Sequence, residues 1–276
     1  MHETLTPPGT AGRPPGRPAR PARSPLRRAV RVLALLTALT LVGGGAWYLF
    51  LFLVTRTETG TTAIDPAVRA VVVEIDSGDV RVGVAGRGER TELRKKLTSS
   101  LRSPDERIER DGDTLRVTTD CGEGMGRCGS DYRLTVKAGT RVRVVTRLGD
   151  VSVTGVRGSV EARTRIGGVR IERVDGDRLV GASKTGAVTM KDVTFDTADA
   201  TSKLGDVRVS RTGPFTRLRA VSKTGDVELR LPRTSGPYDV TAHTKIGDRR
   251  VAVDLDDAAD TAVEARTKIG DVTVTD

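Results

Sequence analysis

One glycine recurs through the C-terminal half of the chain at an almost constant interval of 18 to 23 residues. Most copies begin a Gly-Asp-Val sequence or a close variant of it. The seven glycines are Gly149, Gly167, Gly186, Gly205, Gly225, Gly247 and Gly270. A period near 20 residues is typical of solenoids, in which each repeat can bury its apolar side only against its neighbours. We therefore expect residues 140–276 to form a stack of similar repeats.

Apolar or small residues occupy every second position on both sides of each glycine. Around Gly225 these residues are Leu218, Ala220, Ser222, Thr224, Val227 and Leu229. This period is that of a strand with one buried face, and the glycine is expected to adopt a positive φ and turn a corner between two strands. The predicted fold is all-β: a single-stack β-solenoid, β-helix-like, with rungs of about 20 residues. The number of faces per rung stays open.

Three positions depart from the repeat pattern. Gly168 and Ala187 stand where the other repeats have Asp, and Arg249 stands where they have Val. We expect Arg249 and Arg250 to mark a bulge.

The N-terminal segment differs sharply in composition. Residues 1–31 hold seven of the twelve prolines and seven arginines against one acid, which predicts a disordered cytoplasmic tail. Residues 32–54 are uncharged and long enough to cross a bilayer as a transmembrane helix. A cleaved signal peptide is the alternative, but the apolar run is longer than its hydrophobic region would be.

The arginines before this helix outnumber those just behind it, so the positive-inside rule places the N-terminus in the cytoplasm. The sequence thus predicts a single-pass type II protein of the cell membrane with an extracytoplasmic C-terminal domain. A short stalk is expected over residues 55–67.

Residues 68–139 are predicted to hold the first rung, around Gly78, and an insertion that caps the stack. Within it, Leu93, Leu97 and Leu101 suit a short helix or a loop, and residues 108–117 resemble a hairpin with an Asp-Gly turn. At the other end, Val272–Asp276 forms the last rung with nothing after it to cover it. An uncovered strand row predicts an end-to-end homo-oligomer.

The cysteines are Cys121 and Cys128, on either side of a glycine-rich loop. A zinc site needs four ligands, and no other cysteine or histidine is near. Outside the membrane such a pair is expected to form a disulfide.

The Leu-Gly-Asp-Val and Thr-Gly-Asp-Val corners, with Leu134–Gly139 just before them, resemble a bacterial family of unknown function whose members are labelled "putative adhesins". Members carry such repeats behind a membrane anchor or signal sequence, and similar domains occur in accessory proteins of envelope-stress signalling systems. The resemblance covers about residues 68–276 and implies a β-solenoid, but it brings no site residues with it.

An enzyme is not expected, nor is a metal or another cofactor. His2 lies on the tail and His243 at an outward strand position, so neither has a catalytic triad around it. Sugar-active enzymes need paired carboxylates or aromatic platforms, and the aromatic residues beyond the anchor are expected to be core or loop anchors: Tyr132, Phe195, Phe215 and Tyr238. An acidic run over residues 254–260 is expected to be a solvated loop rather than a calcium site.

The net charge is +10, and the tail contributes seven Arg less one Glu, or +6, of it. Nucleic-acid binding is not expected of a domain outside the membrane. A cation stands two residues before every repeat glycine: Arg147, Arg165, Lys184, Lys203, Lys223, Lys245 and Lys268. Two interpretations stay open. Each cation pairs with the Asp after the glycine, or the column binds an anionic polymer.

These observations favour a non-catalytic, membrane-anchored binding module at the bacterial cell envelope. Its expected partners are the membrane and an anionic envelope polymer. The alternative is a signalling accessory protein that contacts a membrane sensor, and the third interpretation is a polysaccharide-active enzyme.

Overall fold

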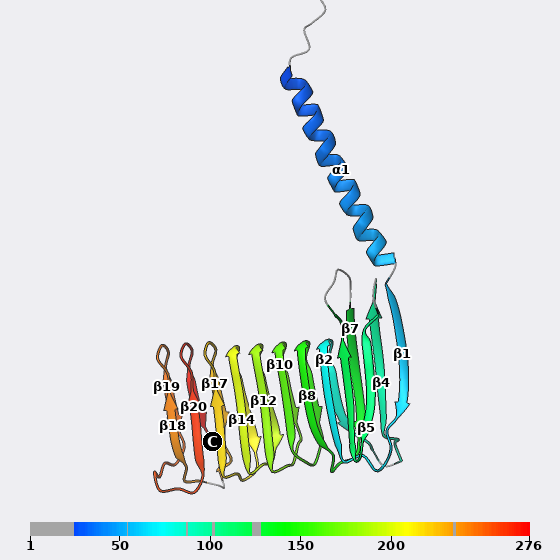
Figure 1. Ribbon diagram of the computed structural model, residues 1–276. Helices are drawn as coiled ribbons and strands as arrows, with labels where there is room; N and C mark the ends of the chain where they lie inside the picture. The colour runs from blue at the N-terminus through cyan, green and yellow to red at the C-terminus, as the bar shows by residue number, and fades with distance from the viewer. Residues whose placement is uncertain (1–24, 54, 87, 101–102, 123–127, 234–235) are drawn as a thin grey trace, which may run out of the picture. The chain divides into compact units, whose positions relative to one another are not determined.

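The computed structural model describes residues 25–53, 55–86, 88–100, 103–122, 128–233 and 236–276 (Figure 1). These residues fall into two compact units, divided between Phe50 and Leu51.

The first unit is built on helix α1 (Pro25–Leu53), of 29 residues. Its segment Ala29–Phe50 is long and apolar enough to span a membrane. The helix begins seven residues before the predicted start at residue 32, so the prediction that the whole of 1–31 is disordered is wrong for residues 25–31. Proline fits the first turn of a helix because the amide it lacks would have no partner there. The rest of the predicted tail, residues 1–24, and Val54 lie outside the described residues.

Beyond the last three residues of α1 the second unit is all-β, and its described residues form two sheets in which most neighbours are parallel. The first sheet has the order β1 (Arg56–Ala63), β4 (Glu92–Ser99), β7 (Cys128–Val136), β3 (Val80–Val84), β9 (Val151–Thr154), β11 (Val169–Glu172), β13 (Val188–Val193), β15 (Val207–Thr212), β17 (Val227–Arg230), β21 (Val272–Thr275), β19 (Arg249–Ala252). The second has the order β18 (Asp239–His243), β20 (Ala262–Arg266), β16 (Arg217–Val221), β14 (Thr197–Leu204), β12 (Arg178–Thr185), β10 (Val160–Ile166), β8 (Arg141–Leu148), β2 (Ala70–Ser77), β6 (Thr114–Asp120), β5 (Asp105–Asp111).

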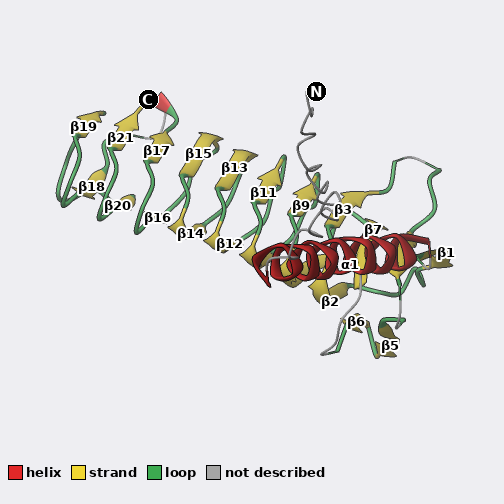
Figure 2. Cartoon of the chain, turned by 90° about the horizontal axis from the view of Figure 1, so that it is seen from above, coloured by secondary structure: helices red, strands yellow, loops and turns green. Residues whose placement is uncertain are grey.

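Each repeat gives one strand to each sheet, and the repeat glycine lies at the corner between them. Figure 2 shows the strands of the repeats as two facing rows. A repeat therefore has two faces, which the sequence had left open. The all-β, β-solenoid-like architecture is confirmed.

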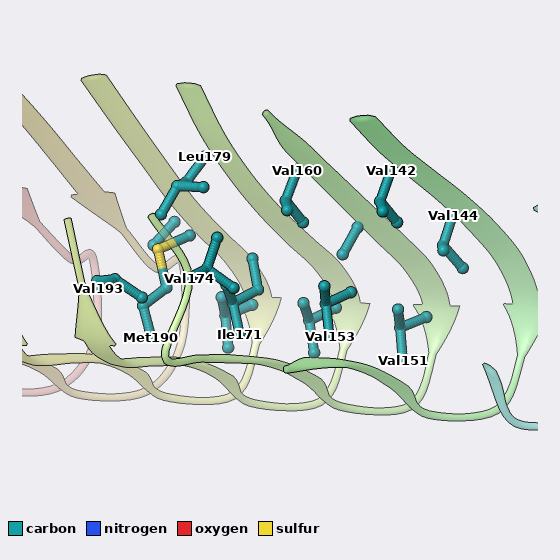
Figure 3. Packing of buried hydrophobic residues seen from close by; sticks show 14 of the residues in the cluster. Val142, Val144, Val151, Val153, Val160, Ile171, Val174, Leu179, Met190 and Val193 are labelled. Carbon is teal, nitrogen blue, oxygen red and sulfur yellow. The ribbon is translucent and has the colours of Figure 1, made fainter. Parts of the chain in front are cut away.

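The core lies between the two sheets and is lined by the inward residues of successive repeats. Val142 and Val160 are aligned across β8 and β10, and Val151 and Val169 across β9 and β11. All four are at most 2% exposed, and Figure 3 shows such valines with Ile171, Leu179 and Met190 filling the space between the sheets. The two-residue period therefore predicted the buried face correctly over most of each strand.

The first rung is where the sequence placed it. Strands β2 and β3 pair with β8 and β9, although an insertion separates these pairs in sequence. The insertion adds strands at that end of the sheets, since β6 pairs with β2 and β7 with β3. The predicted hairpin is confirmed as β5 and β6, which pair antiparallel.

Two predictions about this end, the N-terminal cap formed by β1 and β4–β7, are wrong. Residues 92–99 form strand β4 rather than a helix or loop, because leucines four residues apart also share one face of a strand. Leu93 and Leu97 are buried, and Leu101 lies outside the described residues. The segment expected to be a stalk forms strand β1, which pairs antiparallel with β4.

The order of the last two repeats also differs from the prediction. Strand β20 lies between β16 and β18, and β21 between β17 and β19. The C-terminal strand Val272–Thr275 is thus covered, and the repeat before it is outermost. That repeat carries Arg249 in place of the buried valine, and burying a guanidinium without a partner is costly. Arg249 and Arg250 pair in regular register with Val272 and Thr273, so the predicted bulge is absent.

Candidate binding surface

The cations that precede the repeat glycines form one row along the corner edge. The register aligns the residues on either side of them from repeat to repeat, as for Thr146 with Thr164 and Leu148 with Ile166. In spatial order the row is Arg147, Arg165, Lys184, Lys203, Lys223, Lys268 and Lys245, and all seven side chains are exposed. We call these seven residues the cation row.

The cation row does not pair with the aspartates that follow the glycines. Arg147 forms an ion pair with Asp76, 3.2 Å from Nη2 to Oδ1. Within the described residues, no other member of the row has a carboxylate oxygen within 4.0 Å. The interpretation in which each cation pairs with the aspartate after its glycine is therefore wrong.

The aspartates instead bind the backbone of the neighbouring corner. The carboxylate of Asp206 accepts a hydrogen bond from the amide of Asp226 at 3.0 Å, and that of Asp226 accepts one from Asp271 at 2.9 Å. The same contact is made by Asp131, Asp79, Asp150 and Asp271 to the next corner, at 2.7–3.0 Å. A corner amide lies outside both sheets, so a carboxylate that accepts from it satisfies a group that the strands do not. We call these carboxylates the aspartate row.

The glycine is needed because adjacent corners approach closely. Gly225 has a φ of +133°, and a Cβ placed there would lie 2.5 Å from the carbonyl oxygen of Gly205. The buried hydroxyls three residues before the glycines complete the corner, since Ser222 donates to the carbonyl of Gly205 at 2.9 Å. The sequence suggested only that small residues fit a narrow interior, and it missed this role.

The apolar residues immediately before the glycines point to solvent. The exposed fractions of Leu148, Ile166, Leu204, Ile269 and Ile246 are 44%, 50%, 53%, 49% and 65%. Alternation had assigned them to the buried face, but they stand at the strand ends, beyond the facing sheet. These five residues, the apolar row, lie beside the cation row.

The disulfide is formed as predicted. Cys121 and Cys128 are bonded, with their Cα atoms 5.8 Å apart. The bridge closes the connection between β6 and β7, where the regular repeats have a Gly-Asp corner. On β7, burial raises the pKa of Tyr132, whose hydroxyl donates to Glu106 at 2.7 Å.

The remaining candidates for chemistry are structural or solvated. Tyr132, Phe195, Phe215 and Tyr238 are buried, in agreement with the prediction of core anchors. His243 is exposed, and His2 lies outside the described residues. Among the described residues no group of three or more His, Cys, Asp or Glu could hold a metal ion. The aspartates of residues 254–260 are exposed.

The two sheets of stacked strands, joined at glycine corners, place this chain in the class of β-solenoid-like repeat proteins. The family described as Toastrack DUF4097 matches residues 134–275, and the chain belongs to it. This match confirms the resemblance drawn from the Gly-Asp-Val corners. Solved structures found to be similar to the chain include two that bear the name "putative adhesin".

One such structure, from Bacteroides fragilis NCTC 9343, is 15% identical, covers 80% of this chain and 96% of its own, and has a TM-score of 0.53. Another "putative adhesin", from Parabacteroides merdae ATCC 43184, is 12% identical, with coverage of 80% and 97% and a TM-score of 0.40. A "putative lipid binding protein" from Parabacteroides distasonis ATCC 8503 is 11% identical, with coverage of 80% and 97% and a TM-score of 0.46. The first likeness supports the fold alone. No curated protein matches the chain.

Proposed function

We propose that the chain is a non-catalytic, membrane-anchored binding module on the outer side of the bacterial cell envelope. A single stack of repeats would present the cation row to a linear polyanion such as a teichoic acid. The proposal rests on one observation: all seven cations are exposed, and all except Arg147 lack an ion-pair partner among the described residues. The names of the similar structures agree with a binding role.

The row has the geometry that a linear ligand needs. Parallel strands lie about 4.8 Å apart, so seven consecutive positions span roughly 29 Å. Each contact of an exposed cation with a phosphate is weak, but linked contacts raise the avidity without a deep pocket. Salt screens exposed charges beyond about 8 Å at physiological ionic strength, so binding is expected to weaken steeply as salt is added.

Anchoring is proposed from α1 and the charges around it. The hydroxyls of Thr37 and Thr40 donate to the carbonyls of Leu33 and Leu36, at 3.0 and 3.1 Å, so these polar groups are satisfied within the helix. The excess of arginine before the helix supports a cytoplasmic N-terminus. A phosphatase fused after Asp276 should be active, and protease added to intact protoplasts should remove the bulk of the chain. An inactive fusion with full protection would contradict this orientation.

The binding test changes Lys203, Lys223 and Lys245 together to Gln in the full chain. A matched control changes three lysines outside the row to Gln: Lys96, Lys137 and Lys191. Both variants lose three charges, but only the first is expected to lose binding to teichoic acid and to envelope fractions. Equal binding by the two variants would reject the cation row as the binding surface.

A second candidate function is that of a signalling accessory protein, which the apolar row favours. Strand pairing aligns Gly60 of β1 with Lys95, Tyr132 and Val80, so β1 begins at the corner end of the sheets. Arg56 follows Leu53, the last residue of α1, by three positions. The exposed leucines and isoleucines thus lie at the end of the sheets where β1 begins, and the proposal is that they contact a membrane sensor there. A photo-crosslinker at Leu204 should then capture a sensor kinase or anti-sigma factor, and one at exposed Asp257 should not.

A further inference from the structure

The aspartate row is interrupted at two neighbouring corners. Gly168 and Ala187 occupy the aspartate position in adjacent repeats, between Asp150 and Asp206, as the pairing of β9, β11, β13 and β15 shows. The carboxylate of Asp150 still accepts from the amide of Gly168 at 2.7 Å. The next two amides, of Ala187 and Asp206, have no hydrogen-bond acceptor among the described residues. Two adjacent backbone donors are therefore left where other corners have carboxylates.

An arginine beside the interruption lacks the partner that its equivalents have. Arg81 and Arg208 each bind the aspartate two residues before them, with Nη2–Oδ2 distances of 3.0 Å to Asp79 and 2.8 Å to Asp206. Arg170 is the equivalent residue after Gly168, where no carboxylate exists. Its side chain is 65% exposed, and its Nε lies 3.8 Å from Glu172. A guanidinium thus stands where it can reach an anion at the missing carboxylate.

Two members of the cation row belong to the same repeats. Arg165 and Lys184 precede the corners of Gly168 and Ala187, are exposed, and have no ion-pair partner among the described residues. At the other regular corners an aspartate follows the glycine, so its negative charge balances the positive charge of the same repeat without forming an ion pair with it. Over these two repeats the positive charge is not offset at the corner.

We propose that this interruption is an anion site that binds a phosphate group. The amides of Ala187 and Asp206 would donate to its oxygens, as the corner amides elsewhere donate to carboxylates, and Arg170, Arg165 and Lys184 would supply the charge. Hydrogen bonds to an ionised oxygen are the strong ones, and backbone amides that point together are common in phosphate sites. The inference deepens the proposed function and rests on it, because it names the place on the cation row where a polyanion would be held most firmly.

The test fills the interruption. Ala187→Asp, alone and with Gly168→Asp, would place carboxylates where the phosphate is expected. A Cβ on Gly168 would meet no atom closer than 3.5 Å, so the substitution fits the backbone. Binding of fluorescent polyphosphate to the full chain in zwitterionic detergent should weaken at least about tenfold (about 1.4 kcal/mol), since the hydrogen bonds that are lost are those to a charged group. Thermal melting should show that both variants are folded.

A control adds the same charge far from the site. Thr57→Asp with Thr61→Asp places two carboxylates at exposed positions of β1 and should leave the affinity within a factor of about two, because such charges are screened at this distance. Unchanged binding by the Ala187→Asp variants, or an equal loss in the control, would overturn the anion site. If the lysine variant of the cation row loses binding while the Ala187→Asp variants do not, the proposed function stands and the anion site alone fails.

The phosphate could belong to a polymer or to a lipid headgroup, and amide NMR signals distinguish them. The signals of Ala187 and Asp206 should move when inorganic phosphate is added to the full chain. A further shift with polyphosphate would assign a polymer, and a shift in nanodiscs of phosphatidylglycerol but not of phosphatidylcholine would assign a lipid. Signals that move with none of these probes would overturn the proposal.

Discussion

Corners with an aspartate and the two corners without one have the same backbone conformation. They differ in whether a carboxylate accepts a hydrogen bond from the amide of the neighbouring corner. Gly167 and Gly186, in the corners that lack Asp, both have a φ of +140°, as does Gly205, which Asp206 follows. The hydroxyls of Ser183 and Ser202 donate to the preceding glycine carbonyls at the same distance, 2.9 Å. The glycine and the hydroxyl thus set the corner, whereas the carboxylate can be removed without changing it. Because the corner does not require an aspartate, the residue at this position is free to serve binding.

The largest expected effect tests the part that all corners share. Gly225→Ala and Gly167→Ala should each destabilise the fold by about 3 kcal/mol or more, because a Cβ at either glycine would collide with a backbone carbonyl at a positive φ. Gly168→Ala, one residue further on, should change the stability by no more than about 1 kcal/mol. Denaturant unfolding measures all three. Similar costs at Gly167 and Gly168 would show that the corner geometry is misassigned.

The next effect concerns the N-terminal cap, where a disulfide replaces the Gly-Asp corner. Cys121→Ser with Cys128→Ser should cost about 2–3 kcal/mol, because the bridge closes a short loop in the unfolded chain. The repeats should keep their far-ultraviolet circular dichroism. Non-reducing mass spectrometry should find the two cysteines linked, and loss of the whole β signal in the variant would mean that the cap is needed for the stack.

The smallest stability effect separates the two kinds of corner. Asp226→Ala leaves the amide of Asp271 without its carboxylate and should cost about 1 kcal/mol, since the contact is exposed to water. Ala187→Asp should do the opposite and stabilise the fold by up to about 1 kcal/mol. Destabilisation by both substitutions would mean that the amide of Asp206 is already satisfied.

The sequence predicted the features that depend on local pattern. The repeat period, the inward valines, the hairpin at residues 108–117 and the disulfide follow from spacing and composition. Prediction from the sequence failed where one residue spacing is compatible with two different structures. Leucines four residues apart fit β4 as well as a helix. The residues of the apolar row follow the two-residue period of the buried positions, but they are exposed because they stand at the strand ends.

The order of the last two repeats and the role of the aspartates depend on contacts between repeats. Two sequence signals pointed to the reversed order: Arg249 at a valine position, and glycine intervals of 22 and 23 residues that leave longer connections. For the aspartates, the missing carboxylates at residues 168 and 187 were visible, but their meaning required the amide contacts of the other corners.

Amide hydrogen exchange reports on the interruption of the aspartate row at single residues. The amides of Ala187 and Asp206 should exchange much faster than those of Gly168, Asp226 and Asp271, which donate to carboxylates at 2.7–3.0 Å. Added phosphate should slow the first two and leave the other three unchanged. Equal protection of all five amides without phosphate would show that the amides of Ala187 and Asp206 are not free donors.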